Sequence, residues 1–136
     1  MAGARKPRGI DDDTRRLLVR LARTPRARRL GKPPKRPSRW NPFTVPNPET
    51  AFGIHFTHAS AWQFIADRLE QGEHVETIEM GRPVGATGYV MKLQLKEGSH
   101  RLYVKLELTG SKVIGRSFHL AHPADQRAQR SEGTDP

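Results

Sequence analysis

The sequence contains no cysteine, which excludes disulfide bonds and every metal site built on thiolates. It also has no apolar run near the roughly 18 residues that a membrane-spanning helix needs. The N-terminus is basic and lacks the apolar segment of a secretion signal, so we expect a cytoplasmic protein with no membrane partner. Residues 81–88 contain three glycines, but the GxxxxGK[ST] spacing of a phosphate-binding loop is absent.

Histidines occur in two H-x-x-H pairs, His55 with His58 and His119 with His122. Each pair supplies only two of the ligands that a zinc site needs, and no cysteine or nearby carboxylate completes either set. We therefore predict no metal site and no cofactor.

Acidic residues are fewer than basic ones, and the imbalance lies at one end of the chain. The whole sequence has 24 Lys and Arg against 14 Asp and Glu, a formal net charge of +10. Residues 1–39 hold 14 of these basic residues against three aspartates, so the remainder is nearly neutral. A cationic head attracts RNA, DNA or an acidic protein, although such heads also serve only to keep proteins soluble. Its candidate nucleic-acid-binding residues are Arg15, Arg16, Arg20, Arg23, Arg28 and Arg29.

The sequence divides into four segments. Residues 1–39 form a basic N-terminal extension, in which a short helix is expected at about 11–23 with Asp11 as its N-cap. Residues 40–51 are a Pro-rich linker. Residues 52–122 carry the periodic patterns of an α+β domain, and residues 123–136 form a tail of low apolar content that we expect to be disordered.

Within the domain, one helix precedes four strands. Thr57 is a suitable N-cap for a helix over residues 58–71, whose apolar residues recur on one face. Strands are expected at residues 75–80, 89–96, 102–108 and 113–120. Segregated elements of this kind predict an α+β fold with one helix packed on a four-stranded antiparallel sheet.

The stretch from residue 100 to 120 defines the two faces of that sheet. Apolar residues at 102, 104, 106 and 108 alternate with polar ones, which is the pattern of a strand buried on one side. In the following strand we expect Ile114, Phe118 and Leu120 to face the core. By the same alternation Arg116 would face the core. A charged side chain is tolerated there only at an edge, at a bulge or beside a partner. The opposite face carries Tyr103, Lys105, Ser117 and His119.

The element order resembles that of the RelE-like ribonuclease toxins of bacterial toxin–antitoxin pairs. A more local likeness is to the MqsR toxins, and it lies in two segments, Leu102-Tyr103-Val104-Lys105 and Ser117-Phe118-His119. In the MqsR toxins the second of these strands closes on Ser-Phe-Lys. The match covers about a seventh of the chain. It implies catalytic roles for Tyr103, Lys105 and His119, although histidine replaces a lysine at position 119. Face parity alone adds Lys92 and Gln94.

These residues cover the requirements of metal-independent RNA cleavage. Histidine as a residue type can act as base or acid near neutral pH, which makes His119 the best candidate for proton transfer. Tyr103 can donate or accept a proton or stack on a base, and lysine or arginine can stabilise charge on the phosphate. The predicted catalytic residues are Tyr103, Lys105 and His119, and the predicted substrate-binding residues are Lys92, Gln94, Arg101, Arg116 and Ser117.

The sequence therefore favours an endoribonuclease toxin of a type II toxin–antitoxin pair. Its partners would be RNA, including mRNA on the ribosome, and a cognate antitoxin protein. The alternative is a non-catalytic module that binds RNA, DNA or an acidic protein through the basic head. Exposed faces of small antiparallel sheets are often polar without any catalytic role.

Overall fold

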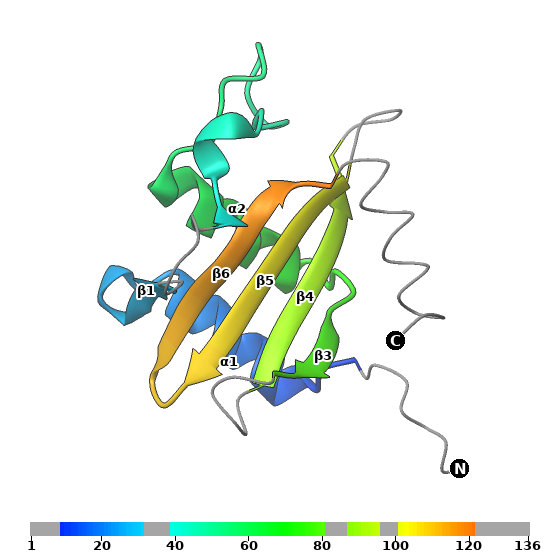
Figure 1. Ribbon diagram of the computed structural model, residues 1–136. Coiled ribbons are helices and arrows are strands. Elements are labelled where there is room, and N and C mark those ends of the chain that lie inside the picture. The colour runs from blue at the N-terminus through cyan, green and yellow to red at the C-terminus, as the bar shows by residue number, and fades with distance from the viewer. Residues whose placement is uncertain (1–8, 32–38, 81–86, 96–100, 122–136) are drawn as a thin grey trace.

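A computed structural model describes residues 9–31, 39–80, 87–95 and 101–121 of the chain. These residues form two layers, in which helices α1 (Asp12–Ala22) and α2 (His58–Glu70) lie against one face of a β-sheet (Figure 1). The opposite face, called the open face below, carries no helix from the described part of the chain. Neither helix of that part is long and apolar enough to cross a membrane.

Helix α1 lies where the sequence analysis places a helix, and it belongs to the core of the fold. Asp11 caps it, since the Asp11 Oδ1 atom accepts a hydrogen bond from the backbone N–H of Thr14 at 2.7 Å. On the inner face of α1, Leu18, Leu21 and Ala22 are buried in one apolar cluster with the residues of α2 and the sheet. Helix α1, which belongs to the basic head, is thus part of the globular structure.

Helix α2 begins with a capping box. The backbone N–H of Ser60 donates to Thr57 Oγ1 at 3.1 Å, and the backbone N–H of Thr57 donates to Ser60 Oγ at 2.8 Å. The helix ends at Glu70, and Gly72 follows with φ = 91°, a left-handed conformation that favours glycine. The residues of α2 that are buried against α1 and the sheet are Ala61, Trp62, Phe64, Ile65, Ala66 and Leu69.

In the described part of the chain, six strands form one mixed sheet. Strands β3 (Glu76–Glu79), β4 (Thr87–Gln94), β5 (Arg101–Thr109) and β6 (Lys112–Leu120) pair antiparallel in chain order. Strands β1 (Arg28–Leu30) and β2 (Arg39–Trp40) both pair in parallel with β6, at successive positions along its outer side. The two earliest strands of the chain therefore lie beside the last one.

The predicted α+β class is confirmed, but one helix on four antiparallel strands describes only part of the fold. The structure adds α1 and two parallel edge strands, all from residues 1–40. β1 and β2 are three and two residues long, too short to show a period of two in the sequence. In the expected linker, the side chains of Trp40 and Val45 are 4% and 0% exposed. The predictions for residues 1–8, 32–38 and 122–136 lie outside the described residues.

Trp40 of β2 enters the core above a glycine of β6. A Cβ atom on Gly115 would lie 2.5 Å from Cζ3 of Trp40, closer than two carbons can pack. The indole also lies 4.9 Å from the Trp62 ring and 5.4 Å from the Phe118 ring, measured between centroids. Glycine at position 115 thus lets the sheet approach this aromatic cluster.

A β-bulge in β6 changes which residues face the core. Lys105 pairs with Ser117, but Leu106 pairs with Gly115, so Arg116 is the extra residue. Beyond the bulge the alternation is reversed, and Ile114 pairs with Glu107 on the open face. The prediction that Ile114 faces the core is therefore wrong. Phe118, on the other side of the bulge, is 0% exposed as expected.

Candidate functional site

The strand register gathers the predicted site residues of the sheet on the open face. Side chains of paired residues point to the same side of a sheet, and they alternate along each strand. The register places seven of the eight predicted residues on this face, on three neighbouring strands: Lys92, Gln94, Arg101, Tyr103, Lys105, Ser117 and His119. Arg116, the unpaired residue of the bulge, reaches the same face through its ion pair with Glu107.

Tyr103 lies at the centre of this group. It pairs with Lys92 on β4 and with His119 on β6, so the three side chains form one row across the sheet. The rings of Tyr103 and His119 have centroids 5.5 Å apart and planes inclined at 33°. The next row towards the strand ends pairs Gln94 with Arg101.

The hydrogen bonding of His119 indicates its tautomer. Its Nδ1 atom lies 3.1 Å from the carbonyl oxygen of Leu120, which can only accept, so Nδ1 carries the hydrogen. In the neutral ring, Nε2 then keeps a lone pair. Nε2 is buried and has no hydrogen-bond partner in the described structure. A ligand can reach this atom only if a neighbouring side chain moves.

Partial burial shifts the pKa values of Lys105 and Tyr103. Burial, the charge of Arg116 and the charge of Arg39 lower the pKa of the Lys105 ammonium. Burial raises the pKa of the Tyr103 hydroxyl. Tyr103 therefore remains protonated at neutral pH and offers an O–H donor on the open face.

Arg116 forms an ion pair with a carboxylate that sequence reasoning did not place in the site. Its Nε atom donates to Glu107 Oε1 at 2.8 Å, and its Nη2 atom donates to the same oxygen. Glu107 is 2% exposed, and its Oε2 atom accepts from Thr109 Oγ1 at 2.9 Å. Alternation along β5 indicates that Glu107 shares the face of Tyr103. The sequence analysis expected Arg116 to lie at an edge, at a bulge or beside a partner, and the structure places it at a bulge with Glu107 as its partner.

The open face is strongly cationic. Strand β2 adds Arg39, which pairs with Ser117 and lies near enough to affect the pKa of Lys105. Sequence reasoning assigned Arg39 to the extension. Among the described residues, strand register gives this face six basic residues, Arg29, Arg39, Lys92, Arg101, Lys105 and Lys112, and two acidic ones, Glu76 and Glu107. Arg116, at the bulge beside Glu107, is the seventh basic residue.

Three of the six head arginines bind groups within the fold. Arg15 donates from Nη1 to the backbone oxygens of Leu69 and Glu73, both at 2.9 Å, at the C-terminal end of α2. Arg23 pairs with two carboxylates of α2 at 2.9 and 2.6 Å. Arg28 donates to the Ala22 oxygen at 3.1 Å and lies over the Trp62 ring. These contacts account for three of the 14 basic residues of the head without a ligand.

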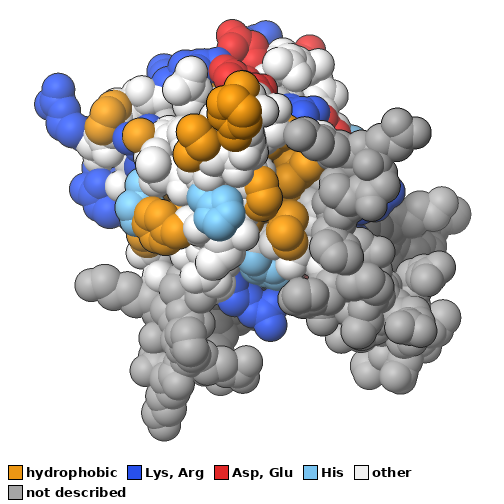
Figure 2. Space-filling model, turned by 90° about the horizontal axis from the view of Figure 1, so that it is seen from above, with side chains coloured by type: hydrophobic (Ala, Val, Ile, Leu, Met, Phe, Trp, Pro, Cys, Tyr) orange, Lys and Arg blue, Asp and Glu red, His pale blue; other side chains and the backbone are white. Residues whose placement is uncertain are grey.

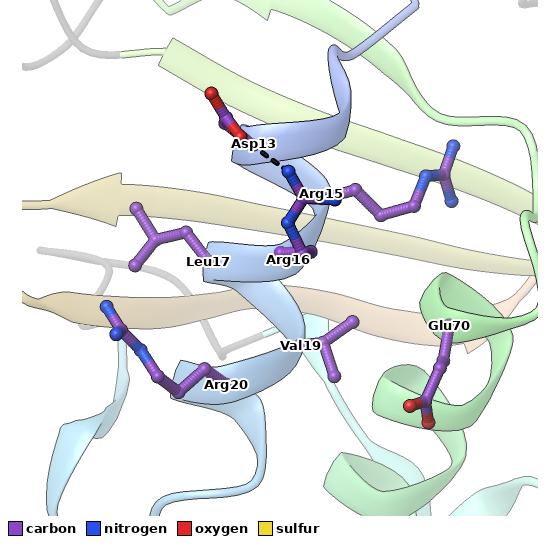
Figure 3. Close-up of a pocket in the computed structure, with 7 residues that line it drawn as sticks. All are labelled: Asp13, Arg15, Arg16, Leu17, Val19, Arg20 and Glu70. Carbon is purple, nitrogen blue, oxygen red and sulfur yellow. Dashed lines mark hydrogen bonds and ion pairs between the residues drawn. The ribbon is translucent and has the colours of Figure 1, made fainter.

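The other three head arginines lie nearer the surface. Arg16 pairs with Asp13 at 2.6 Å, and both side chains are largely exposed. Arg29 donates to the backbone oxygens of Arg26 and Arg28. Arg16 and Arg20 line a groove on α1 beside α2, which mixes both charges with apolar atoms (Figure 3). The residues lining this groove are Asp13, Arg15, Arg16, Leu17, Val19, Arg20 and Glu70.

The H-x-x-H pair at positions 55 and 58 is engaged locally. Nδ1 of His55 donates to the Phe43 oxygen at 2.7 Å, and Nδ1 of His58 lies 3.2 Å from the Trp40 Nε1 donor. Among the described residues, no three His, Asp or Glu side chains lie together as metal ligands would. The second pair includes His122, which is outside the described residues.

Comparison of the chain with protein-family models, with curated proteins and with solved structures finds no match.

Proposed function

We propose that this chain binds RNA on the open face and cleaves it without a metal ion, as a toxin controlled by an antitoxin protein. The observation that carries the proposal is the cluster of Tyr103, His119 and Lys105 on neighbouring positions of β5 and β6. The surrounding seven basic and two acidic residues attract a phosphate backbone. These two strands also carry the resemblance to the MqsR toxins, so the proposed substrate is cytoplasmic mRNA, including mRNA on the ribosome.

The cluster offers each group that the reaction needs. Neutral His119 can accept the 2′-hydroxyl proton at Nε2, and in its protonated form it can give a proton to the leaving 5′-oxygen. Lys105 supplies positive charge for the phosphorane oxygens. Tyr103, which remains protonated, donates a hydrogen bond to the phosphate. A movement of the side chains around Nε2 precedes catalysis, since that atom is buried in the free protein.

The test is cleavage of a mixed RNA pool by the purified full chain in the presence of EDTA. We compare the wild type with His119→Ala and Tyr103→Phe. The matched control is His74→Ala, whose side chain is 75% exposed and does not belong to the Tyr103–His119 ring pair. Loss of a general acid–base group predicts a rate at least about 100-fold lower for His119→Ala. His74→Ala should cleave like the wild type. Equal cleavage by the wild type and His119→Ala would overturn the site.

A second candidate is RNA binding without cleavage on the same face. Two observations favour it: Nε2 of His119 is buried, and Glu107 already occupies one edge of the Arg116 guanidinium. The same samples separate the two functions. If no variant cleaves RNA, while the wild type binds it in a salt-dependent manner that Lys92→Gln and Arg101→Gln weaken, the face is a binding surface only.

A further inference from the structure

Three large apolar side chains project from the loop that connects β2 to α2. In this apolar loop, residues 41–57, Phe43 is 52% exposed, Phe52 is 91% exposed and Ile54 is 62% exposed. Figure 2 shows apolar side chains gathered on this end of the molecule, with histidines among them. A contiguous exposed apolar patch on a folded protein marks an interaction site more often than a scattered one does.

Hydrogen bonds hold the loop in one shape. The backbone N–H of Asn47 donates to the Ile54 oxygen at 2.8 Å, and that of Phe56 donates to the Val45 oxygen at 3.0 Å. The backbone N–H of Ile54 also donates to Thr50 Oγ1 at 2.8 Å. Phe56 and Val45 anchor the loop in the core at 1% and 0% exposure. The exposed side chains are therefore presented on a fixed backbone, which lowers the entropy cost of binding.

Phe43 is fixed separately at the base of the loop. Its oxygen accepts a hydrogen bond from His55 Nδ1 at 2.7 Å. Its ring meets the His58 ring edge-on, with centroids 4.7 Å apart. Phe43 on one side of the patch, and Phe52 and Ile54 on the other, are thus all held on a fixed backbone.

The remainder of this chain offers little that could cover the patch. The segments outside the described residues contain only two large apolar side chains, Met1 and Val84. A second copy is also a poor occupant, because two molecules of net charge +10 repel each other.

The composition of the loop favours a protein over RNA as the occupant. Residues 41–57 contain no lysine or arginine to bind phosphates, and their single charged residue is Glu49. Ile54 has no flat face on which a base could stack. The loop thus presents exposed apolar side chains and no basic residue on a cationic molecule, with Arg39 at its base in β2.

We propose that the apolar loop is the docking site for an acidic protein with an apolar groove. Phe52 and Ile54 insert into the groove, and acidic residues at its rim meet the surrounding positive charge. This arrangement uses apolar contacts for affinity and charge for the choice of partner. The inference does not depend on RNA cleavage, because Phe43, Phe52 and Ile54 do not belong to the open face.

The test begins with photo-cross-linking of the full chain in its native cells. The photoreactive amino acid p-benzoyl-phenylalanine is placed at position 52, and at position 20 on the outer side of α1 as a control. We expect an acidic protein to be cross-linked from position 52 and not from position 20. That protein is then purified and its affinity is measured for the wild type, Phe52→Ser, Ile54→Ser and the matched control Leu30→Ser, which changes an exposed apolar residue of β1.

Phe52→Ser and Ile54→Ser should each weaken binding at least about tenfold, as truncation of an interface anchor does, and Leu30→Ser should not. Binding of the wild type should weaken as salt rises. Thermal unfolding checks that Phe52→Ser folds like the wild type, as expected for a side chain that is 91% exposed. The proposal is overturned by the absence of a protein adduct from position 52, by an adduct with RNA, lipid or a protein without excess acidic residues, or by equal affinity of Phe52→Ser.

Discussion

Glu107 and Arg116 form an ion pair on the open face, at the point where the bulge interrupts β6. Loss of one member of a buried ion pair costs about 3–5 kcal/mol, because the other charge stays buried without a partner. The Arg116 side chain is 27% exposed, which places this pair at the lower end of that range. We therefore expect Glu107→Ala to be strongly destabilised in urea unfolding.

The double variant Glu107→Ala/Arg116→Ala should be more stable than Glu107→Ala alone, since it leaves no unpaired charge. Glu79→Ala, at an exposed position of β3, is the control and should unfold like the wild type. Additive losses in the double variant would mean that the two side chains act independently.

Lys105 gives the stability of the fold a dependence on pH. Below the lowered pKa of Lys105 the ammonium is charged in both the folded and the unfolded chain, so folding bears the full cost of its burial. As pH rises through that lowered pKa towards the ordinary value of 10.5, the folded chain loses the proton first and becomes relatively more stable.

Lys105→Met removes this cost while keeping most of the side-chain volume. We expect the variant to have a higher midpoint of thermal unfolding than the wild type at pH 7, and this difference should shrink as pH rises towards 10.5. Lys112→Met, at the end of β6, is the comparison. A difference that is the same at every pH would show that packing, and not charge, is responsible.

Gly115 tests the close approach of the sheet to Trp40. Gly115→Ala places a methyl group 2.5 Å from Cζ3 of the indole, and overpacking of this kind costs about 1–3 kcal/mol. Chemical denaturation should show the loss, and Trp40 fluorescence should change with it. Gly9→Ala is the control, because a Cβ atom there meets nothing within 4 Å. Equal stability of the two variants would contradict the packing described for β2.

At the scale of elements, α1 and α2 are joined by an arginine that belongs to the basic head. Arg15 binds the backbone oxygen of Leu69 in the last turn of α2 and that of Glu73, which follows the helix. Hydrogen bonds from a charged donor contribute about 1.5–3 kcal/mol, so Arg15→Ala should lower the free energy of unfolding by about that amount. Arg16→Ala, which removes only an exposed pair with Asp13, should change it little. Equal losses of unfolding free energy in Arg15→Ala and Arg16→Ala would mean that the contacts of Arg15 with Leu69 and Glu73 add no stability beyond that of an exposed ion pair.

The sequence predicts the elements with clear periodicity and misses those without it. The four antiparallel strands and both helices lie close to their expected positions, because capping residues and alternating apolar residues mark them. β1 and β2 could not be predicted, since Arg28–Leu30 and Arg39–Trp40 become strands only by pairing with β6. The sequence analysis therefore placed these residues outside the domain.

The same distinction applies to the candidate site. Alternation along β4 and β5 correctly places Lys92, Tyr103 and Lys105 on one face. The contacts that complete the site depend on tertiary structure: the bulge brings Arg116 to Glu107, and the pairing of β2 brings Arg39 to the face. Neither follows from local pattern.

The charge of the whole molecule can be examined through the salt dependence of RNA binding. For single-stranded nucleic acid, each phosphate contact contributes about 0.7 to the slope of log affinity against log salt concentration. Arg101→Gln and Lys92→Gln should each reduce the slope by about 0.7 if the open face binds RNA. Arg23→Gln should leave it unchanged, because Arg23 pairs with two carboxylates of α2. The reverse result would place RNA on the helices.

The parallel pairing of β1 and β2 with β6 has a consequence for synthesis on the ribosome. Residues 28–30 and 39–40 are translated early, but their partners at 113–118 are translated last among the strands. At typical elongation rates of about 5–20 residues per second, the early strands spend on the order of ten seconds without a neighbour. A nascent chain stalled before residue 113 has no β6, so β1 and β2 have no strand to pair with and the open face lacks Arg116, Ser117 and His119 until translation of the domain is nearly complete.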